Sequence, residues 1–303
     1  MRVVFMGTPA FAVPSLQALL DAGHEVVGVF TQPDRPAGRG NRLQASPVKQ
    51  LAVQNDIPVF QPERIRRDGV EDLRALAPEV CVTAAFGQIL SQEVLDIPAR
   101  GTVNVHASLL PRHRGSAPIA WAILQGDETV GVTTMLTDKG IDTGAMLLRR
   151  EIPRDPEATC GELTERLAAV GAALLTETLA AMAAGTLTPV PQDEAAMTYD
   201  PMLKKEMSAV DWTQAGRDVA NRILALNPWP CCAVDIPEGR LKLLRARAVE
   251  GAGEPGAILA ADPKQGLVIA CGEGAVEILE LQAPGGKAMK AKDWLRGHRL
   301  TEV

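Results

Sequence analysis

Two polar side chains alternate with valines along a short apolar stretch, and their types suit a reacting carbonyl group. Val103 and Val105 alternate with Asn104 and His106, which predicts a strand with both polar side chains on one face. An amide N–H can donate to a developing oxyanion, and an imidazole can stabilise that charge or move a proton. The same two residues could instead only satisfy backbone groups at a strand end.

A loop must follow this strand, because proline and glycine interrupt the pattern soon afterwards. Pro111, Gly115 and Pro118 prevent the strand from continuing, and the loop between them carries Arg112 and Arg114. The polar pair therefore stands where a strand meets a loop.

Two segments together resemble the signatures of formyltransferases that use 10-formyltetrahydrofolate. The first is NVHASLLP at residues 104–111 with RHRGSAP at 112–118, and the second is TDKGIDTG at 137–144, which contains Asp142. Two motifs in the right order and with matching separation are far more specific than either motif alone. One departure is His113, which stands where the family more often has an aromatic residue.

The resemblance implies a role for three side chains. Asn104 would donate a hydrogen bond to the oxyanion, and His106 would stabilise it as imidazolium or relay a proton. Asp142 would orient His106, raise its basicity and help to pass the amine proton through water. Without the motif, an aspartate beside a glycine turn would be interpreted as a structural cap.

The resemblance also implies the residues that hold the folate. The run at 80–86 is apolar apart from Thr83, as expected for a central parallel strand. The end of this run matches the place where the family holds the pteridine ring with main-chain groups and apolar side chains. The implied folate-binding residues are Gln88, Ile89 and Leu90, together with Ser108, Leu109, Leu110 and Pro111. Ile89 and Leu90 could equally be core residues.

The first part of the chain predicts an α/β fold. A strand at 2–7, a helix at 10–22 and a strand at 25–31 form a βαβ unit, which favours a Rossmann-like, mostly parallel sheet. The first turn, GTPAFA at 7–12, lacks the later glycines of a dinucleotide site. A dinucleotide cofactor is therefore not expected.

Residues 32–45 are rich in proline and glycine and carry an excess of positive charge. A loop of this length is either a solvated surface segment or functional. It resembles the insertion with which methionyl-tRNA formyltransferases contact the acceptor end of tRNA. The resemblance implies phosphate contacts by Arg39 first, then by Arg42 and Arg35, which face only Asp34 within the loop.

The chain is long enough for two domains. We expect a catalytic domain at 1–189, a proline-containing linker at 190–206 and a second domain at 207–303. From residue 231 onward, about five short strands with tight turns predict a small antiparallel, OB-like β-barrel.

Two basic clusters in this second domain are either ordinary solvated faces or a grip on an RNA backbone. One is Arg240, Lys242, Arg245 and Arg247. The first two have even numbers and the last two odd numbers, so a bulge near Leu243 and Leu244 would be needed to keep all four side chains on one face of a strand. The other is Lys287, Lys290, Lys292, Arg296 and Arg299. The family uses such a C-terminal domain for tRNA, and we assign tRNA contacts to Lys287, Lys290 and Lys292.

Composition limits the remaining possibilities. The net charge of −6 argues against uniform nucleic-acid binding, and five scattered cysteines without a Cys-x-x-Cys spacing indicate reduced thiols. No histidine or cysteine spacing indicates a metal. We find neither a signal peptide nor an apolar run of about 18 residues, so we expect a soluble, cytoplasmic protein, without membrane contact and monomeric.

The expected reaction transfers the formyl group of 10-formyltetrahydrofolate to the α-amine of methionine esterified to initiator tRNA. A neutral amine is already a nucleophile, so catalysis needs positioning and oxyanion stabilisation but no serine or cysteine intermediate. Two alternatives remain. The acceptor could be a small amine such as glycinamide ribonucleotide or an amino sugar nucleotide, or the protein could bind folate or RNA without turnover.

Overall fold

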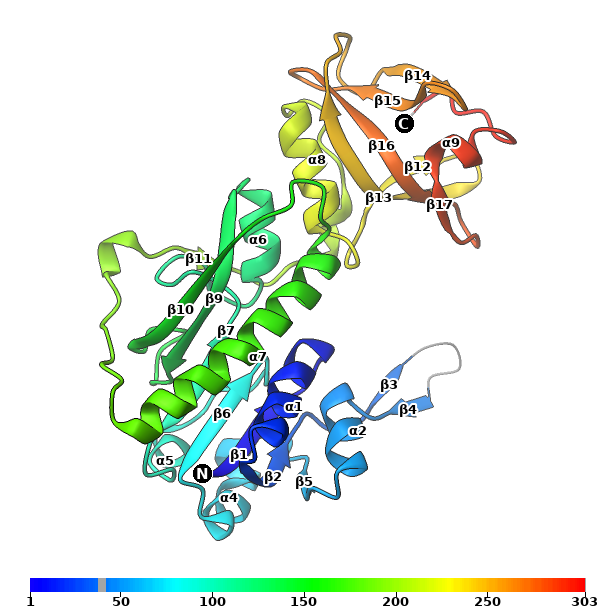
Figure 1. Cartoon of the computed structure of the whole chain (residues 1–303). Coiled ribbons are helices and arrows are strands. Elements are labelled where there is room, and N and C mark those ends of the chain that lie inside the picture. The colour runs from blue at the N-terminus through cyan, green and yellow to red at the C-terminus, as the bar shows by residue number, and fades with distance from the viewer. Residues whose placement is uncertain (38–41, 303) are drawn as a thin grey trace. The chain divides into compact units, whose positions relative to one another are not determined.

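The computed structural model describes residues 1–37 and 42–302, which form two compact units (Figure 1). The first unit comprises Met1–Gly115, Gly131–Ile152 and Thr164–Tyr199, and the second comprises Ser116–Val130, Pro153–Leu163 and Asp200–Val303. The units therefore alternate along the chain. The division at 189 and 206 that we expect from the sequence stays a prediction.

The first unit is built on a seven-stranded sheet of order β10-β9-β7-β6-β1-β2-β5. Strands β5, β2, β1, β6 and β7 run parallel, and β9 is antiparallel to β7. The predicted mostly parallel α/β sheet is thus confirmed. The strands are β1 (Arg2–Gly7), β2 (Glu25–Phe30), β5 (Val59–Phe60), β6 (Val80–Ala84), β7 (Thr102–His106), β9 (Thr129–Leu136) and β10 (Met146–Pro153).

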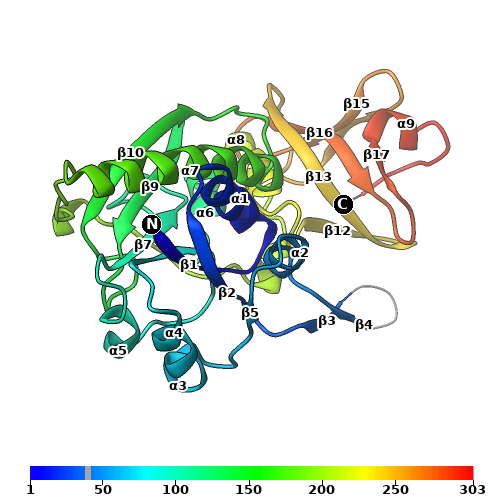
Figure 2. The ribbon, with the colours of Figure 1, turned by 60° about the horizontal axis from the view of Figure 1, so that its bottom comes forward.

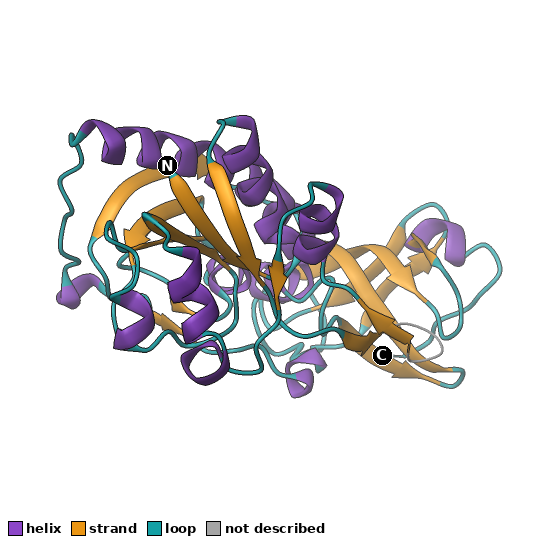
Figure 3. Cartoon of the chain, turned by 90° about the horizontal axis from the view of Figure 1, so that it is seen from below, coloured by secondary structure: helices purple, strands orange, loops and turns teal. Residues whose placement is uncertain are grey.

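Helices cover both faces of this sheet (Figures 2 and 3). On one face, α3 (Ile65–Asp68), α4 (Val70–Leu76) and α5 (Gln92–Leu95) enclose a core cluster with Val4 and Met6 of β1 and Cys81 of β6. On the other lie α1 (Val13–Asp21) and α7 (Cys160–Ala184). At Gly171 of α7, an added Cβ would lie 2.8 Å from the Val105 side chain, so glycine permits the close approach of helix and strand.

Of the described helices, only α7 is long and apolar enough to cross a membrane by length and composition. Its most apolar window is 44% buried within the protein. Core helices of soluble proteins pass the same test, so this finding is weak evidence for a membrane span.

The remaining described elements of the first unit are η1 (Ala10–Ala12), β3 (Arg35–Ala37), β4 (Arg42–Gln44), α2 (Pro47–Gln54), β8 (Arg114–Gly115) and η2 (Glu194–Ala196). Strand β11 (Tyr199–Asp200) stands at the unit boundary.

The second unit is an antiparallel β domain, as predicted. Its sheet has the order β12-β13-β16-β15-β14, and β17 pairs with β16. The strands are β12 (Cys232–Ile236), β13 (Gly239–Val249), β14 (Ile258–Asp262), β15 (Gly266–Ala270), β16 (Ala275–Gln282) and β17 (Ala288–Lys290). The pairing of β13 with β16 shifts between Leu243 and Arg245, which confirms the predicted bulge.

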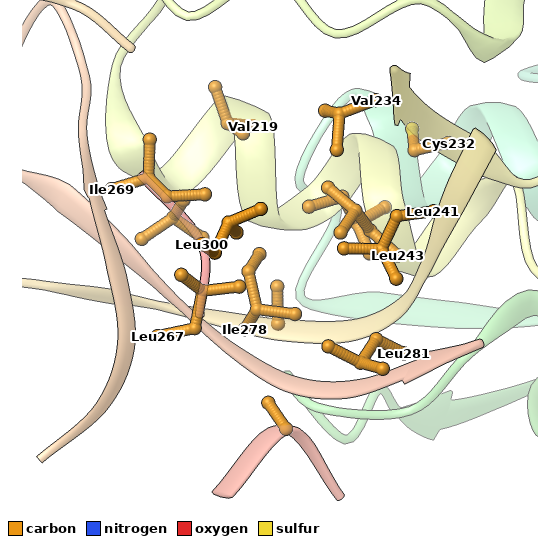
Figure 4. Close-up of a cluster of buried hydrophobic side chains, with 14 of the residues drawn as sticks. Val219, Cys232, Val234, Leu241, Leu243, Leu267, Ile269, Ile278, Leu281 and Leu300 are labelled. Carbon is orange, nitrogen blue, oxygen red and sulfur yellow. The ribbon is translucent and has the colours of Figure 1, made fainter. Parts of the chain in front are cut away.

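The strands of this domain enclose their own core (Figure 4). Side chains from β12, β13, β15 and β16 meet those of α8 (Gly216–Ala225) and α9 (Ala291–Trp294). Helix α6 (Pro118–Leu124) and η3 (Lys205–Ser208) complete the unit. None of the five cysteines forms a disulfide, and burial raises the pKa of Cys81 and of Cys232 to about 12, as fits packed thiols.

Candidate active site

Asn104 has its amide oriented by the neighbouring strand. The parallel register of β6 and β7 pairs Thr83 with Asn104, and Thr83 Oγ1 donates to Asn104 Oδ1 over 2.9 Å. The carbonyl oxygen of the amide is therefore occupied. The Nδ2 group makes no hydrogen bond within the described residues and can donate to a ligand oxygen.

His106 is 6% exposed, and both of its ring nitrogens face oxygen atoms. Nε2 lies 2.8 Å from the carbonyl oxygen of His113, which can only accept, so Nε2 carries a proton. Nδ1 lies 3.6 Å from Asp142 Oδ1. This second separation is that of an ion pair and is longer than a direct hydrogen bond. Nδ1 is therefore the nitrogen that can gain or lose a proton beside a carboxylate.

Asp142 occupies a turn that its own motif builds. Its φ is 54°, in the left-handed region that aspartate tolerates better than most residues, and its Oδ2 accepts from Gly115 N over 2.9 Å. Asp138 Oδ1 caps the turn by accepting from Gly140 N and Thr143 Oγ1 at 3.0 and 2.6 Å. These bonds explain why the segment at 137–144 is rich in small and polar residues.

Gly144 is required for steric reasons, because an added Cβ would lie 1.6 Å from the carbonyl oxygen of Leu136. The turn that carries Asp142 is thereby pressed against the end of β9. The structure thus brings His106 and Asp142 together, and it places Asn104 two residues before His106 on β7.

The loop after His106 is closed by side chains of its own and of β9. Thr133 Oγ1 donates to the carbonyl oxygen of Ser108 over 2.7 Å and accepts from Leu110 N over 3.2 Å. Ser108 Oγ donates to the carbonyl oxygen of Arg112 over 2.8 Å. Thr133 is a residue that the sequence does not single out, since threonines are common in strands.

The residues assigned to folate differ in exposure. Ile89 is 70% exposed, whereas Leu90 and Leu110 are 7% and 0% exposed and belong to the core. Gln88 uses its side chain to accept from Ile65 N over 2.6 Å and to donate to the carbonyl oxygen of Pro62 over 3.0 Å. These two bonds orient the Gln88 side chain and leave one N–H of its amide, together with the main chain, for the proposed contact.

A pocket of ≈ 650 Å³ lies where the strand order reverses between β1 and β6. Ligands of open α/β sheets bind at such switch points, and a pocket of this size suits a small molecule or a nucleotide. Asn104, His106 and Asp142 do not line it. Its lining includes Thr8, Gln32, Arg35, Ser46, Phe86 and Gly87.

Gln32 connects two walls of this pocket, and sequence reasoning missed it. Its Nε2 donates to the carbonyl oxygens of Phe86 and Gly87 at 3.2 and 3.1 Å, and its N donates to Thr8 Oγ1 at 3.3 Å. The start of the basic loop is thus bonded to the segment that precedes Gln88. A glutamine before a proline gives no signal of such a role.

Asp34, the one acidic residue of the basic loop, is bound by side chains that follow the loop in sequence. Lys49 Nζ lies 2.7 Å from Asp34 Oδ2, and Gln61 Nε2 donates to Asp34 Oδ1 over 2.8 Å. The hydrogen bond from Lys49, assisted by that from Gln61, lowers the pKa of Asp34. Arg35 is exposed, whereas Arg39 and the side chain of Arg42 lie outside the described residues.

In the second unit, the two basic clusters differ. Arg245 and Arg247 of β13 pair with Glu162 and Glu277 at 2.5 and 2.7 Å, and Arg240 lies 3.6 Å from Asp235. These pairs favour the interpretation of β13 as a structural face.

The C-terminal cluster keeps more free charge. Lys292 lies 3.7 Å from Glu277, whereas Lys287 and Lys290 are exposed and have no salt bridge to any described residue. For metals, we find no group of three or more histidine, cysteine, aspartate or glutamate side chains able to hold an ion in residues 1–37 and 42–302.

Two family models match the chain. The model described as formyl transferase matches residues 1–179, and that described as formyl transferase, C-terminal domain, matches residues 202–299.

Two curated relatives are similar over nearly their whole length. The chain is 48% identical over 300 residues to the methionyl-tRNA formyltransferase of Trichlorobacter lovleyi, covering 99% of this chain and 95% of the relative. It is 51% identical over 303 residues to the methionyl-tRNA formyltransferase of Magnetococcus marinus, covering 99% and 96%.

Solved structures show the same fold at lower identity. The N-formyltransferase of Helicobacter canadensis, in complex with folinic acid and dTDP-3-aminofucose, matches with a TM-score of 0.72 and 18% identity over 92% of this chain and 98% of that one. HypX of Aquifex aeolicus, in complex with tetrahydrofolic acid, matches with a TM-score of 0.64 and 21% identity over 97% of this chain and 47% of that one. From the family models and the curated relatives, we conclude that the chain belongs to the formyl transferase family.

Proposed function

We propose that this protein transfers the formyl group of 10-formyltetrahydrofolate to the α-amine of methionine on initiator tRNA. The observation that carries the proposal is the 3.6 Å separation of His106 Nδ1 from Asp142 Oδ1 beside an amide whose donor group is available. The similarity to methionyl-tRNA formyltransferases over nearly the whole chain supports the choice of substrate.

Asn104 is suited to hold the formyl oxygen. With Oδ1 occupied by Thr83, its Nδ2 donates to the oxygen on which negative charge develops as the amine attacks. Because the donor is fixed before the reaction, little reorganisation is needed as the charge appears. The folate supplies the activated formyl group, and the exposed apolar Ile89 supports binding of its ring nearby.

His106 and Asp142 manage the proton of the attacking amine. Nε2 of His106 is held by the carbonyl oxygen of His113, so Nδ1 is the site of exchange. The carboxylate of Asp142 stabilises a proton on Nδ1, and the 3.6 Å separation leaves the contact to tighten in the substrate complex. The amine proton then passes to water or to the folate nitrogen, whose bond to the formyl carbon breaks as the new amide forms.

Positively charged side chains in both units support a tRNA as the acceptor. Arg35 is exposed and lines the pocket at the switch point, and Asp34 is committed to Lys49. With Arg39 and Arg42, Arg35 forms a basic loop suited to the phosphates of an acceptor end. Lys287 and Lys290 offer further phosphate contacts, and we place the protein in the cytoplasm as a monomer.

A formyl-transfer assay tests this proposal. Radiolabelled 10-formyltetrahydrofolate is offered with methionyl-initiator tRNA, free methionine, glycinamide ribonucleotide or a dTDP-amino sugar. Label should enter the charged tRNA at least about 10²-fold faster than any small amine, as expected if remote phosphate contacts contribute to the transition state. Faster labelling of a small amine would contradict the tRNA substrate, and no labelling of any acceptor would leave a binding protein.

A further inference from the structure

Residues 190–198, which we name the strap, contact the loop that follows His106 and the turn that carries Asp142. The strap follows α7 and passes beside β10, where Val190 and Met146 exchange two backbone hydrogen bonds of 2.8 Å (Figure 1). From the sequence, we expect this segment to be a linker between domains. In the structure, it instead bonds to several other segments of the first unit and connects them.

Gln192 is the centre of these contacts. Its Nε2 donates to the carbonyl oxygens of Asp142 and Gly144 at 2.7 and 2.8 Å. Its Oε1 accepts from Arg114 Nε at 2.9 Å. One half-buried amide therefore uses both N–H groups on the turn of Asp142 and its oxygen on the loop that follows His106.

Arg114 and Thr198 strengthen the connection. The guanidinium of Arg114 is 3% exposed and also binds Glu194 of the strap at 2.8 and 3.1 Å. Thr198 accepts from His113 N through Oγ1 at 2.7 Å and from Arg114 N through its carbonyl oxygen at 2.9 Å. His113 in turn presents the carbonyl oxygen that holds His106.

We propose that Gln192 is a positioning residue, which holds the Asp142 turn against the loop of His113 and so sets the separation of the Asp142 carboxylate from His106. The turn needs such a brace because Asp142 has a positive φ, a conformation that costs free energy in a residue other than glycine. The inference rests on the proposed function, since it concerns the same imidazole and carboxylate.

The test compares Gln192→Glu with a matched variant, Asn55→Asp. Gln192→Glu keeps the size of the side chain and an acceptor for Arg114 but removes both N–H donors. Asn55→Asp removes a comparable N–H, which binds the carbonyl oxygen of Leu51 at 2.9 Å on the exposed end of α2. Gln192→Glu should lower kcat roughly 10- to 100-fold with KM for the folate within about twofold, whereas Asn55→Asp should leave kcat unchanged.

A double-mutant cycle separates positioning from general support of the fold. If Gln192 acts through Asp142, then Gln192→Glu combined with Asp142→Asn should be about as slow as Asp142→Asn alone. Multiplied losses, or a Gln192→Glu enzyme with normal kcat beside a slow Asp142→Asn enzyme, would overturn the positioning role and leave the proposed function standing. Normal turnover by Asp142→Asn would instead overturn the proposed function itself. Thermal unfolding of each variant verifies that the loss of kcat is not a loss of folded protein.

Discussion

His106 Nδ1 lies 3.6 Å from Asp142 Oδ1, and the same short loop anchors both side chains. The carbonyl oxygen of His113 holds Nε2 of the imidazole, and the N–H of Gly115 holds the second oxygen of the carboxylate. The imidazole and the carboxylate are therefore each oriented before any substrate binds, and only the short remaining gap between them has to close. Preorganisation of this kind lowers the reorganisation that a charge-separated transition state requires.

Replacing Asp142 by asparagine should slow formyl transfer by about 10²-fold or more. The amide keeps the shape of the side chain but cannot stabilise a proton on His106. Single-turnover rates with saturating folate would measure the effect, and Asp21→Asn on α1 provides a surface control. A rate within threefold of the wild type would remove Asp142 from the mechanism.

Replacing Asn104 by alanine should reduce kcat by about 10²–10³ while folate still binds, the usual loss on removing one oxyanion donor. Folate affinity can be followed by tryptophan fluorescence or calorimetry. Should turnover and folate binding fall together, Asn104 would be supporting the pocket and not the oxyanion.

Thr83→Val should cause a smaller loss, of about 3- to 30-fold in kcat, because it removes the partner that orients the Asn104 amide but leaves the donor in place. In the Asn104→Ala background, Thr83→Val should have almost no further effect. An equal loss in both backgrounds would mean that Thr83 acts on the packing of β6 alone.

The architecture can largely be predicted from local patterns. Side-chain patterns in the sequence predict a buried strand at β6, a strand at β7 and a bulge in β13. The structure confirms these three features. Asp142 is different. Only the resemblance to a family motif singles it out, because its meeting with His106 depends on how β9 returns to β7.

Contacts that depend on tertiary structure are beyond such reasoning. Gln192 lies in a segment with no periodic pattern, and nothing local indicates that its amide spans two loops. The sequence does not distinguish Leu90 and Leu110 from Ile89, since all three are aliphatic residues beside a loop. In the structure, Leu90 and Leu110 are buried in the core, whereas Ile89 is exposed. The excess of positive charge at residues 32–45 is evident from the sequence, but the ion pair of Asp34 with Lys49 of the following helix is not.

Arg39→Ala should weaken the use of tRNA far more than the binding of folate. If Arg39 contacts a phosphate, then the slope of log KM for tRNA against log salt should become shallower by about one unit. Lys264→Ala, in the turn between β14 and β15, provides a control of equal charge change. Equal weakening of tRNA and folate binding would point to misfolding of the loop.

Asp34→Asn should destabilise the protein at neutral pH, and the difference from the wild type should vanish in acid. Because Lys49 holds the pKa of Asp34 below its ordinary value, the folded protein binds the proton less readily than the unfolded chain. The stabilisation is therefore present above the ordinary aspartate pKa of about 4 and is lost as the pH falls through the lower folded value. Urea unfolding of both proteins between pH 3 and 7 would measure it, with Lys49→Met as the partner variant. A difference that persists unchanged at the acid end would show that Asp34 acts through its shape and not through its charge.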